Sequence, residues 1–232
     1  MRLLLLSNSG RPFLAHCRGA LAVFLGPARR VAFVSAASLN DEAGYYQLAR
    51  AALEGEPTGL GVEHLRWDDA FAGTLERAEA VFVGGGNTYA LLDRLGRSGL
   101  LEALRARVRA GLPYIGASAG SNVAGPNILT TNDWNVVGLG TFEALGLVPF
   151  NVNPHYKETD PAMASGSETR DTRISEYLLV RDNPVVGIEE GAMLRVEGET
   201  TTVLGTGRGK LFARGREPRW LLPGEGLDLR GK

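Results

Sequence analysis

A serine lies at the centre of the segment most able to do chemistry. Residues 114–122 read YIGASAGSN, with Gly116 two residues before Ser118 and Gly120 two residues after it. An apolar strand that enters such a turn and continues as a helix is typical of a nucleophile elbow, in which small neighbours allow a strained turn that exposes the hydroxyl. The first amides of the helix would point toward developing negative charge. We therefore predict that Ser118 is a nucleophile.

A nucleophilic serine needs a base, and the chain has three histidines. His16 falls in an amphipathic stretch, and His64 lies near a short, weak strand, so a helix contact and an edge position are expected for them. His155 follows Pro154 in the polar segment NVNPHY. Loops at strand ends are common places for catalytic groups, so His155 is the predicted base.

The base in turn needs an acid that orients its ring. Asp133, in the segment TTND, is one candidate, and Glu190, in GIEEG, is the other. Glu190 stands where an apolar run ends before a glycine, so its carboxylate could point back across the sheet. Spacing along the chain does not choose between the two.

Three consecutive glycines form a second informative turn, Gly84–Gly86, followed by Asn87 and Thr88. The turn lacks the Lys-Ser/Thr pair of a phosphate loop and the G-x-G-x-x-G spacing of a dinucleotide site. The amide of Gly85 or Gly86, together with that of Ala119, is predicted to form an oxyanion hole, with Asn87 beside the substrate. An anion-binding module built on these glycines is the alternative.

The elements that must position these residues alternate along the first half of the chain. Strands are predicted over 2–7, 31–34, 62–65, 80–83 and 113–117, and helical spacing is found over 13–25, 41–53, 91–95 and 100–108. Strands that are apolar throughout and alternate with helices predict an α/β fold, with a mostly parallel sheet flanked by helices.

The second half is expected to add one helix and several short strands. The helix is predicted over 167–181, and glycine-separated apolar runs predict extra strands near the C-terminal edge of the sheet at 185–188, 192–196, 200–204, 210–213 and 219–222. No repeat and no long linker interrupts the pattern. We therefore expect residues 1–232 to form a single α/β hydrolytic domain.

Composition limits the possible partners. The 232 residues carry a net charge of -1, and 44% are hydrophobic, which excludes a disordered segment and disfavours nucleic acid as a partner. The single cysteine, Cys17, excludes a disulfide framework and a cysteine-based zinc site. The apolar run at 3–6 is far shorter than a membrane span or a secretory signal, so we expect a cytoplasmic protein without membrane contact.

Together these motifs resemble the peptidase E family of bacterial α-aspartyl dipeptidases. The resemblance covers essentially the whole chain, in the family's order: LLLLSNS at the start, VGGGNT, IGASAGSNV, TTND, NPH, ETR and GIEEG. It implies a class I glutamine amidotransferase-like fold, hydrolysis of dipeptides with N-terminal aspartate, and no cofactor or metal. It also implies a Ser-His-Glu triad of Ser118, His155 and Glu190, with Asp133 as a further site residue. Glu189 stands where the family usually has proline.

An aspartyl substrate needs a cation in the site. Arg170, in the ETR element, is the expected partner, because its planar fork can pair both carboxylate oxygens and a helix capped by Ser167 would place it near the catalytic loop. Two other functions remain open. One is a cyanophycinase-like hydrolase of aspartyl-arginine linkages, and the other is an amidotransferase-like binding protein with an inactive site. The number of subunits also stays open, with a homodimer as one assembly.

Overall fold

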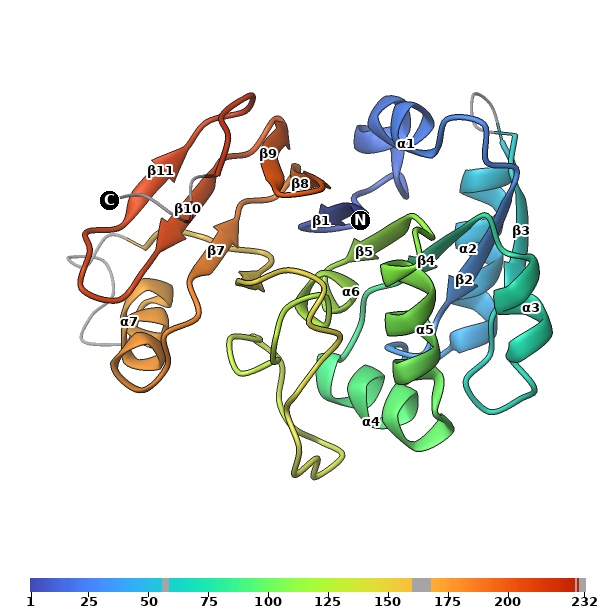
Figure 1. Cartoon of the computed structure of the whole chain (residues 1–232), viewed down its shortest axis with the longest axis horizontal. Helices are drawn as coiled ribbons and strands as arrows, with labels where there is room; N and C mark the ends of the chain where they lie inside the picture. The colour runs from blue at the N-terminus through green and yellow to red at the C-terminus, as the bar shows by residue number, and fades with distance from the viewer. Residues whose placement is uncertain (56–58, 160–167, 228, 230–232) are drawn as a thin grey trace.

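The computed structural model of the chain describes residues 1–55, 59–159, 168–227 and 229, and it contains two β-sheets with helices packed around them (Figure 1). The larger sheet has seven strands in the order β3-β2-β4-β5-β1-β8-β9. Its strands are β1 (Arg2–Leu6), β2 (Arg30–Val34), β3 (Gly61–His64), β4 (Ala80–Val83), β5 (Tyr114–Ala117), β8 (Ala192–Glu197) and β9 (Thr200–Gly205).

Five of these strands pair with one another in parallel, and the other two join the sheet through antiparallel pairs. Strands β1 to β5 pair with one another only in parallel, whereas β8 pairs antiparallel with both β1 and β9. The predicted α/β fold with a mostly parallel sheet is therefore confirmed. The polar residues that follow β1, β4 and β5 leave the sheet at its carboxyl edge, where parallel α/β sheets place their ligands.

Helices cover both faces of the larger sheet, because alternate residues of each strand point to opposite sides. Leu4 and Leu6 of β1 pack in one apolar cluster with residues of α1 and α2, and Leu3 and Leu5 pack in the other with residues of α3 to α5. The helices are α1 (Arg18–Leu25), α2 (Glu42–Glu54), α3 (Ala72–Arg77), α4 (Thr88–Ser98), α5 (Leu100–Arg109) and α6 (Ala119–Asn122).

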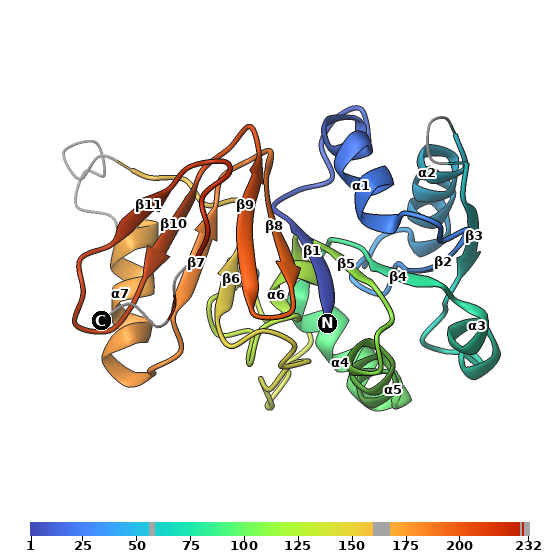
Figure 2. The same ribbon diagram turned by 45° about the horizontal axis from the view of Figure 1, so that its top comes forward.

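The second sheet has four strands in the order β11-β10-β7-β6 and lies beside β8 and β9 (Figure 2). On it packs α7, whose Ile174 and Leu178 join Val185 and Phe212 in one apolar cluster. These elements are β6 (Asn151–Asn153), α7 (Arg170–Val180), β7 (Val185–Ile188), β10 (Gly209–Phe212) and β11 (Arg219–Leu221).

The second sheet corrects one expectation about the short C-terminal strands. All five exist, but only β8 and β9 extend the edge of the larger sheet; β7, β10 and β11 pair with one another and with β6. Spacing along the chain could not show this, because glycine-separated apolar runs of similar length do not specify their partners.

Helix starts also differ from the expectation. Regular helix begins at Arg18 rather than near Phe13, since Leu14 has a positive φ of 57° and only a 3₁₀ turn spans Ala15–Cys17. The cap of α7 is Thr169, whose Oγ1 accepts a hydrogen bond from the Thr172 amide, and the predicted cap Ser167 lies outside the described residues. Helix α3 was not predicted. None of the helices in the described ranges is long and apolar enough to cross a membrane.

Candidate active site

Ser118 sits in a strained turn between β5 and α6. Its φ and ψ are 51° and -108°, a conformation that a residue with a side chain rarely adopts. Its amide donates to the Leu6 carbonyl at 3.0 Å, and Ser121 Oγ donates to the same carbonyl at 2.7 Å. The turn is thus tied to the end of β1. Strain of this kind collects at functional sites, where the surroundings hold it in place.

The serine hydroxyl is the first member of a hydrogen-bonded chain of three side chains. Ser118 Oγ lies 2.8 Å from His155 Nε2, and His155 Nδ1 lies 2.6 Å from Glu190 Oε1. A carboxylate only accepts, so Nδ1 carries the proton and a neutral ring leaves Nε2 free to accept from the serine. His155 also has a positive φ, of 54°; among the described non-glycine residues only Leu14 and Ser118 share this feature.

The second sheet carries both His155 and Glu190. Strands β6 and β7 are parallel, with Asn153 opposite Gly187, so the residues that follow each strand emerge at the same edge. His155 comes two residues after β6, and Glu190 two residues after β7. The pairing of two short strands therefore brings together side chains that are 35 positions apart in sequence.

Two polar residues after β1 complete this arrangement, and the sequence analysis did not single them out. Buried Ser7 accepts from the His155 amide at 2.9 Å and donates to the Ile188 carbonyl at 3.0 Å. Asn8 Nδ2 donates to Glu190 Oε2. Their signal in the sequence was the position directly after a fully buried strand, where polar side chains reach the carboxyl edge of the sheet.

Asp133, the other candidate acid, lies elsewhere. Its Oδ2 accepts from the Thr88 amide at 2.7 Å and from Thr131 Oγ1 at 3.2 Å. The carboxylate is thus placed at the start of α4, where a negative charge is favourable, and not at the imidazole. Asn87 caps the same helix: its Oδ1 accepts from the Ala90 amide at 2.9 Å and its Nδ2 donates to the Trp134 carbonyl at 3.0 Å.

Each of the three glycines lies close to a different neighbour. A Cβ on Gly84 would come within 2.6 Å of the Tyr45 ring, and one on Gly85 within 3.1 Å of Ser118 Cβ. A Cβ on Gly86 would collide with the Ala37 carbonyl, and its φ of 137° suits glycine alone. The triple glycine therefore lets the turn pass close to both the nucleophile and α2.

The amide of Gly85 corrects part of the predicted oxyanion hole. It donates to Tyr45 Oη at 2.8 Å, so it is already engaged and is not a free donor. The amide of Ala119 opens α6 and therefore has no partner within that helix. Tyr45 was missed in the sequence, because nothing near it in the chain indicates that α2 brings its hydroxyl to the glycine turn.

The Ser118 and His155 side chains face a cavity of about 880 Å³, here called the catalytic cavity. The segment after β1 and the start of α2, including Phe13 and Tyr45, also line this cavity. Gly85, Gly86 and Asn87 also line it. A small peptide could therefore reach the serine hydroxyl directly.

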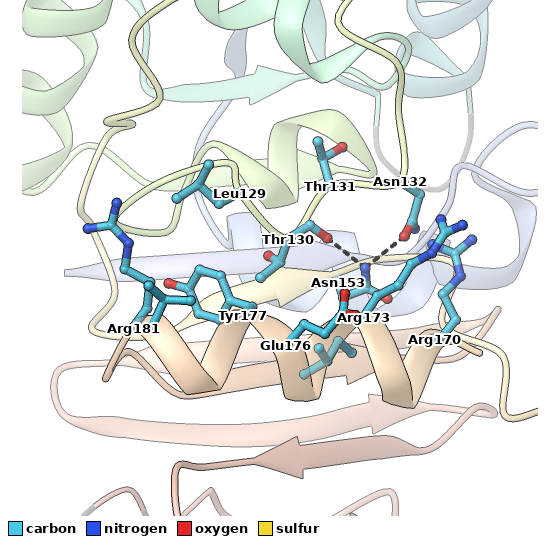
Figure 3. A pocket seen from close by; sticks show the side chains of 12 residues that line it. Leu129, Thr130, Thr131, Asn132, Asn153, Arg170, Arg173, Glu176, Tyr177 and Arg181 are labelled. Atoms are coloured by element: carbon cyan, nitrogen blue, oxygen red, sulfur yellow. Dashed lines mark hydrogen bonds between the residues drawn. The ribbon is translucent and has the colours of Figure 1, made fainter. Parts of the chain in front are cut away.

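Arg170 lines a second cavity, of about 500 Å³, here called the arginine cavity. Figure 3 shows Arg170 and Arg173 near one end of α7 and Arg181 at the other. Burial, followed by the charge of Arg173, lowers the pKa of Arg170, and Asp133 opposes this shift. The cavity does not include Ser118 or His155, but its wall contains Asn153, two residues before His155. Arg170 is thus close to the catalytic loop and outside the catalytic cavity.

An α/β fold in which a strained serine contacts an imidazole held by a carboxylate is the arrangement that serine hydrolases use. The model of peptidase family S51 matches residues 3–204. The chain therefore belongs to peptidase family S51 and is a serine peptidase.

Individual relatives agree with this assignment. The chain is 46% identical over 239 residues to "Peptidase E" of Streptomyces coelicolor, covering 100% of this chain and 97% of that protein. It is 44% identical to the "Probable alpha-aspartyl dipeptidase" of Drosophila melanogaster, covering 90% and 89% of the two chains. The crystal structure of a peptidase from an acI-B1 Actinobacterium shares the fold, with a TM-score of 0.75 at 18% identity over 98% of this chain and 96% of that one.

Proposed function

We propose that the chain is a dipeptidase that hydrolyses dipeptides with N-terminal aspartate through a Ser118–His155–Glu190 triad and an acyl-enzyme. The observation that carries the proposal is the unbroken hydrogen-bonded chain from Glu190 through His155 to Ser118. The names of the relatives, peptidase E and alpha-aspartyl dipeptidase, supply the substrate class.

In the first half of the reaction, Ser118 Oγ attacks the carbonyl carbon of the aspartyl residue. The new C–O bond forms while the hydroxyl proton passes to His155 Nε2, and Glu190 stabilises the resulting imidazolium. The tetrahedral intermediate then collapses, and the C–N bond breaks. The leaving amine takes the proton from Nε2, so an aspartyl ester of Ser118 remains and the second amino acid departs.

In the second half, water attacks the ester carbonyl and gives a proton to His155 Nε2. The C–O bond to Ser118 breaks, the proton returns to Oγ, and aspartate leaves. In both halves the carbonyl oxygen becomes negative and needs donors. The amides of Ala119 and Gly86 are the proposed backbone donors, since Gly85 is engaged by Tyr45.

Arg170 is the proposed partner of the aspartyl side chain. The half-buried guanidinium lies near the like charge of Arg173, and a substrate carboxylate would compensate its charge. Asn153 lines the arginine cavity and His155 lines the catalytic cavity, so the segment 153–155 borders both. The substrate would bind across this segment, with Asp133 and Asn87 near its path.

The test is turnover of Asp-Leu compared with Asn-Leu, β-Asp-Leu and β-Asp-Arg by the purified chain. We expect cleavage of Asp-Leu and little of the others, because only the first presents both an α-linked bond and a free side-chain carboxylate. A preference for the β-linked peptides would indicate the cyanophycinase-like function instead. A folded protein that cleaves none of the four would contradict the proposal.

A further inference from the structure

Tyr45 is a polar group in the catalytic cavity that the proposed mechanism has not used. It lies in the first turn of α2, and its hydroxyl oxygen accepts the Gly85 amide at 2.8 Å. Gly85 also lies next to the nucleophile, because a Cβ on this residue would be 3.7 Å from Ser118 Oγ. The residue that donates to Tyr45 is therefore the one that packs against Ser118. Tyr45, Ser118 and His155 line the same cavity.

Packing fixes the position of the Tyr45 ring. Phe13 and Phe33 meet it edge-on, with ring centroids 5.8 and 5.4 Å away. Gly84 leaves the space that the ring and hydroxyl occupy, because a Cβ there would lie 2.6 Å from the ring and 2.8 Å from the oxygen. The hydroxyl therefore has few alternative positions, which is the condition for a preorganised donor.

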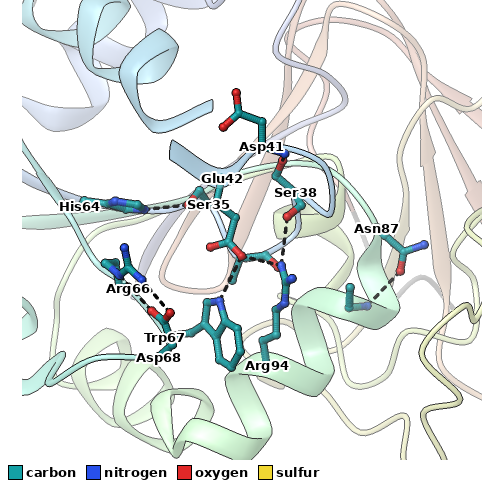
Figure 4. Close-up of polar contacts among 12 residues, drawn as sticks. Ser35, Ser38, Asp41, Glu42, His64, Arg66, Trp67, Asp68, Asn87 and Arg94 are labelled. Atoms are coloured by element: carbon teal, nitrogen blue, oxygen red, sulfur yellow. Dashed lines mark hydrogen bonds and ion pairs between the residues drawn. The ribbon is translucent and has the colours of Figure 1, made fainter. Parts of the chain in front are cut away.

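The start of α2 is also held in place by its own cap and by contacts with α4. Asp41 caps the helix by accepting from the Gly44 amide at 2.7 Å. Arg94 of α4 pairs with Glu42 at 2.8 Å and donates to the carbonyls of Ala36 and Ser38 at 2.8 and 3.0 Å (Figure 4). These contacts hold the segment between β2 and α2, which forms one wall of the catalytic cavity.

The hydroxyl has its own proton to give. A phenol can donate once and accept twice; the Gly85 amide occupies one acceptor position, and the Ser9 side chain, which also hydrogen-bonds the phenol oxygen, can occupy the other. Burial raises the pKa of Tyr45, so the group stays protonated at neutral pH, although the Gly85 amide and the Ser9 side chain act in the opposite direction. Accepting one hydrogen bond polarises the O–H group and makes it a stronger donor.

We propose that Tyr45 Oη is a donor of the oxyanion hole, in the position that the sequence analysis gave to the Gly85 amide. This rests on the proposed function. The negative oxygen of the tetrahedral intermediate accepts the Tyr45 O–H, and the Gly85 amide acts through Tyr45 by donating to its oxygen. Tyr45 is then a catalytic residue, and the glycine turn is its support.

The first experiment compares Tyr45→Phe with Tyr46→Phe in the full chain. Each variant loses one hydroxyl from the same helix, but Tyr46 Oη donates to the Val62 carbonyl at 2.9 Å and its ring stacks on His64, away from the site. Loss of one oxyanion donor typically lowers kcat by about 10²- to 10³-fold. We expect that loss for Tyr45→Phe with KM on Asp-Leu little changed, and near wild-type kcat for Tyr46→Phe.

The second experiment separates donation from support of the fold. The boronic acid analogue of aspartate forms a tetrahedral adduct with a serine, whereas aspartate itself stays trigonal. Tyr45→Phe should weaken boronate binding by the same factor as kcat and leave aspartate binding little changed. Unchanged kcat, or equal weakening of both ligands, would overturn the role of Tyr45. If wild type and Tyr46→Phe both fail to cleave Asp-Leu, the proposed function fails, and boronate affinity still tests the donor.

Discussion

The two sheets contribute to the site in different ways. The larger sheet supplies Ser118 from a strained turn that directly follows the buried strand β5. The smaller sheet supplies His155 and Glu190, whose side chains are 43% and 58% exposed and which meet only because β6 pairs with β7. The motif of the nucleophile therefore lies within one segment of the chain, whereas the base and the acid are brought together by a pairing of distant segments.

Ser7 joins the two sheets at this point. It follows β1 of the larger sheet, yet its hydroxyl bonds the His155 amide and the Ile188 carbonyl of the smaller one. The geometry between nucleophile and base thus depends on one buried hydroxyl at the junction. The nucleophile can thus be predicted from its sequence motif, whereas the positions of the base and the acid depend on how the two sheets pack together.

The largest expected effect is at the nucleophile. Ser118→Ala should lower kcat on Asp-Leu by about 10⁶-fold, because a nucleophile that acts as a unit with its base cannot be replaced by the rest of the site. Thermal unfolding should stay close to wild type, since alanine removes only a hydroxyl and the Ser118 amide still bonds Leu6. Retention of more than about a tenth of the activity would show that Ser118 is not the nucleophile.

The next effect compares the two acids. Glu190→Gln should lower kcat by about 10⁴-fold. The neutral amide no longer holds the proton on His155 Nδ1, and it does not stabilise the imidazolium that forms during the reaction. Asp133→Asn should cost little, because asparagine still offers an acceptor to the Thr88 amide. Steady-state kinetics of both variants on Asp-Leu decide the matter, and a more damaging Asp133→Asn in a folded protein would reverse the assignment.

A smaller effect concerns specificity. Arg170→Met should lower kcat/KM on Asp-Leu by about 10- to 150-fold, the worth of one charge-assisted pair, and change any Asn-Leu turnover little. Arg181→Met is the matched control, because Arg181 lines the same cavity at the other end of α7. Equal losses on both dipeptides would mean that Arg170 supports structure, and that the aspartyl carboxylate binds elsewhere.

The junction between the sheets gives a fourth prediction. Ser7→Ala would leave the partly buried His155 amide and the buried Ile188 carbonyl without their partner, a loss of about 1–3 kcal/mol in the free energy of unfolding. Because the same hydroxyl positions His155, kcat should fall while KM changes less. Chemical denaturation measures the loss of stability, and steady-state kinetics measure kcat and KM. A destabilised variant with wild-type kcat would show that the Ser7 hydroxyl does not position His155.

The smallest expected effect is that of thiol modification. Cys17 is buried, and burial raises the pKa of its thiol to about 12. The thiolate is the reactive form, so at pH 7 to 8 the group stays protonated and unreactive. Iodoacetamide should leave activity on Asp-Leu unchanged and label the chain only after unfolding. Rapid inactivation with labelling at Cys17 would contradict the buried position of this residue.

Much of the fold could be predicted because its elements are encoded locally. The parallel strands are apolar throughout, and their helices show one apolar face, so the α/β sheet followed from periodicity. The helix of residues 72–77 was missed because its few apolar positions give a weak period, and the start of α7 was misplaced because Thr169 and Ser167 are equally good caps.

By itself the sequence determined the turn at Ser118, the loop position of His155 and the glycine turn at 84–86, since each depends on residues adjacent in the chain. Tertiary structure alone placed Glu190, and not Asp133, against the imidazole, moved Arg170 to a separate cavity, and gave the Gly85 amide to Tyr45. These choices are contacts through space between residues 35 to 45 positions apart, and no spacing along a chain encodes the pairing of strands or the docking of a helix.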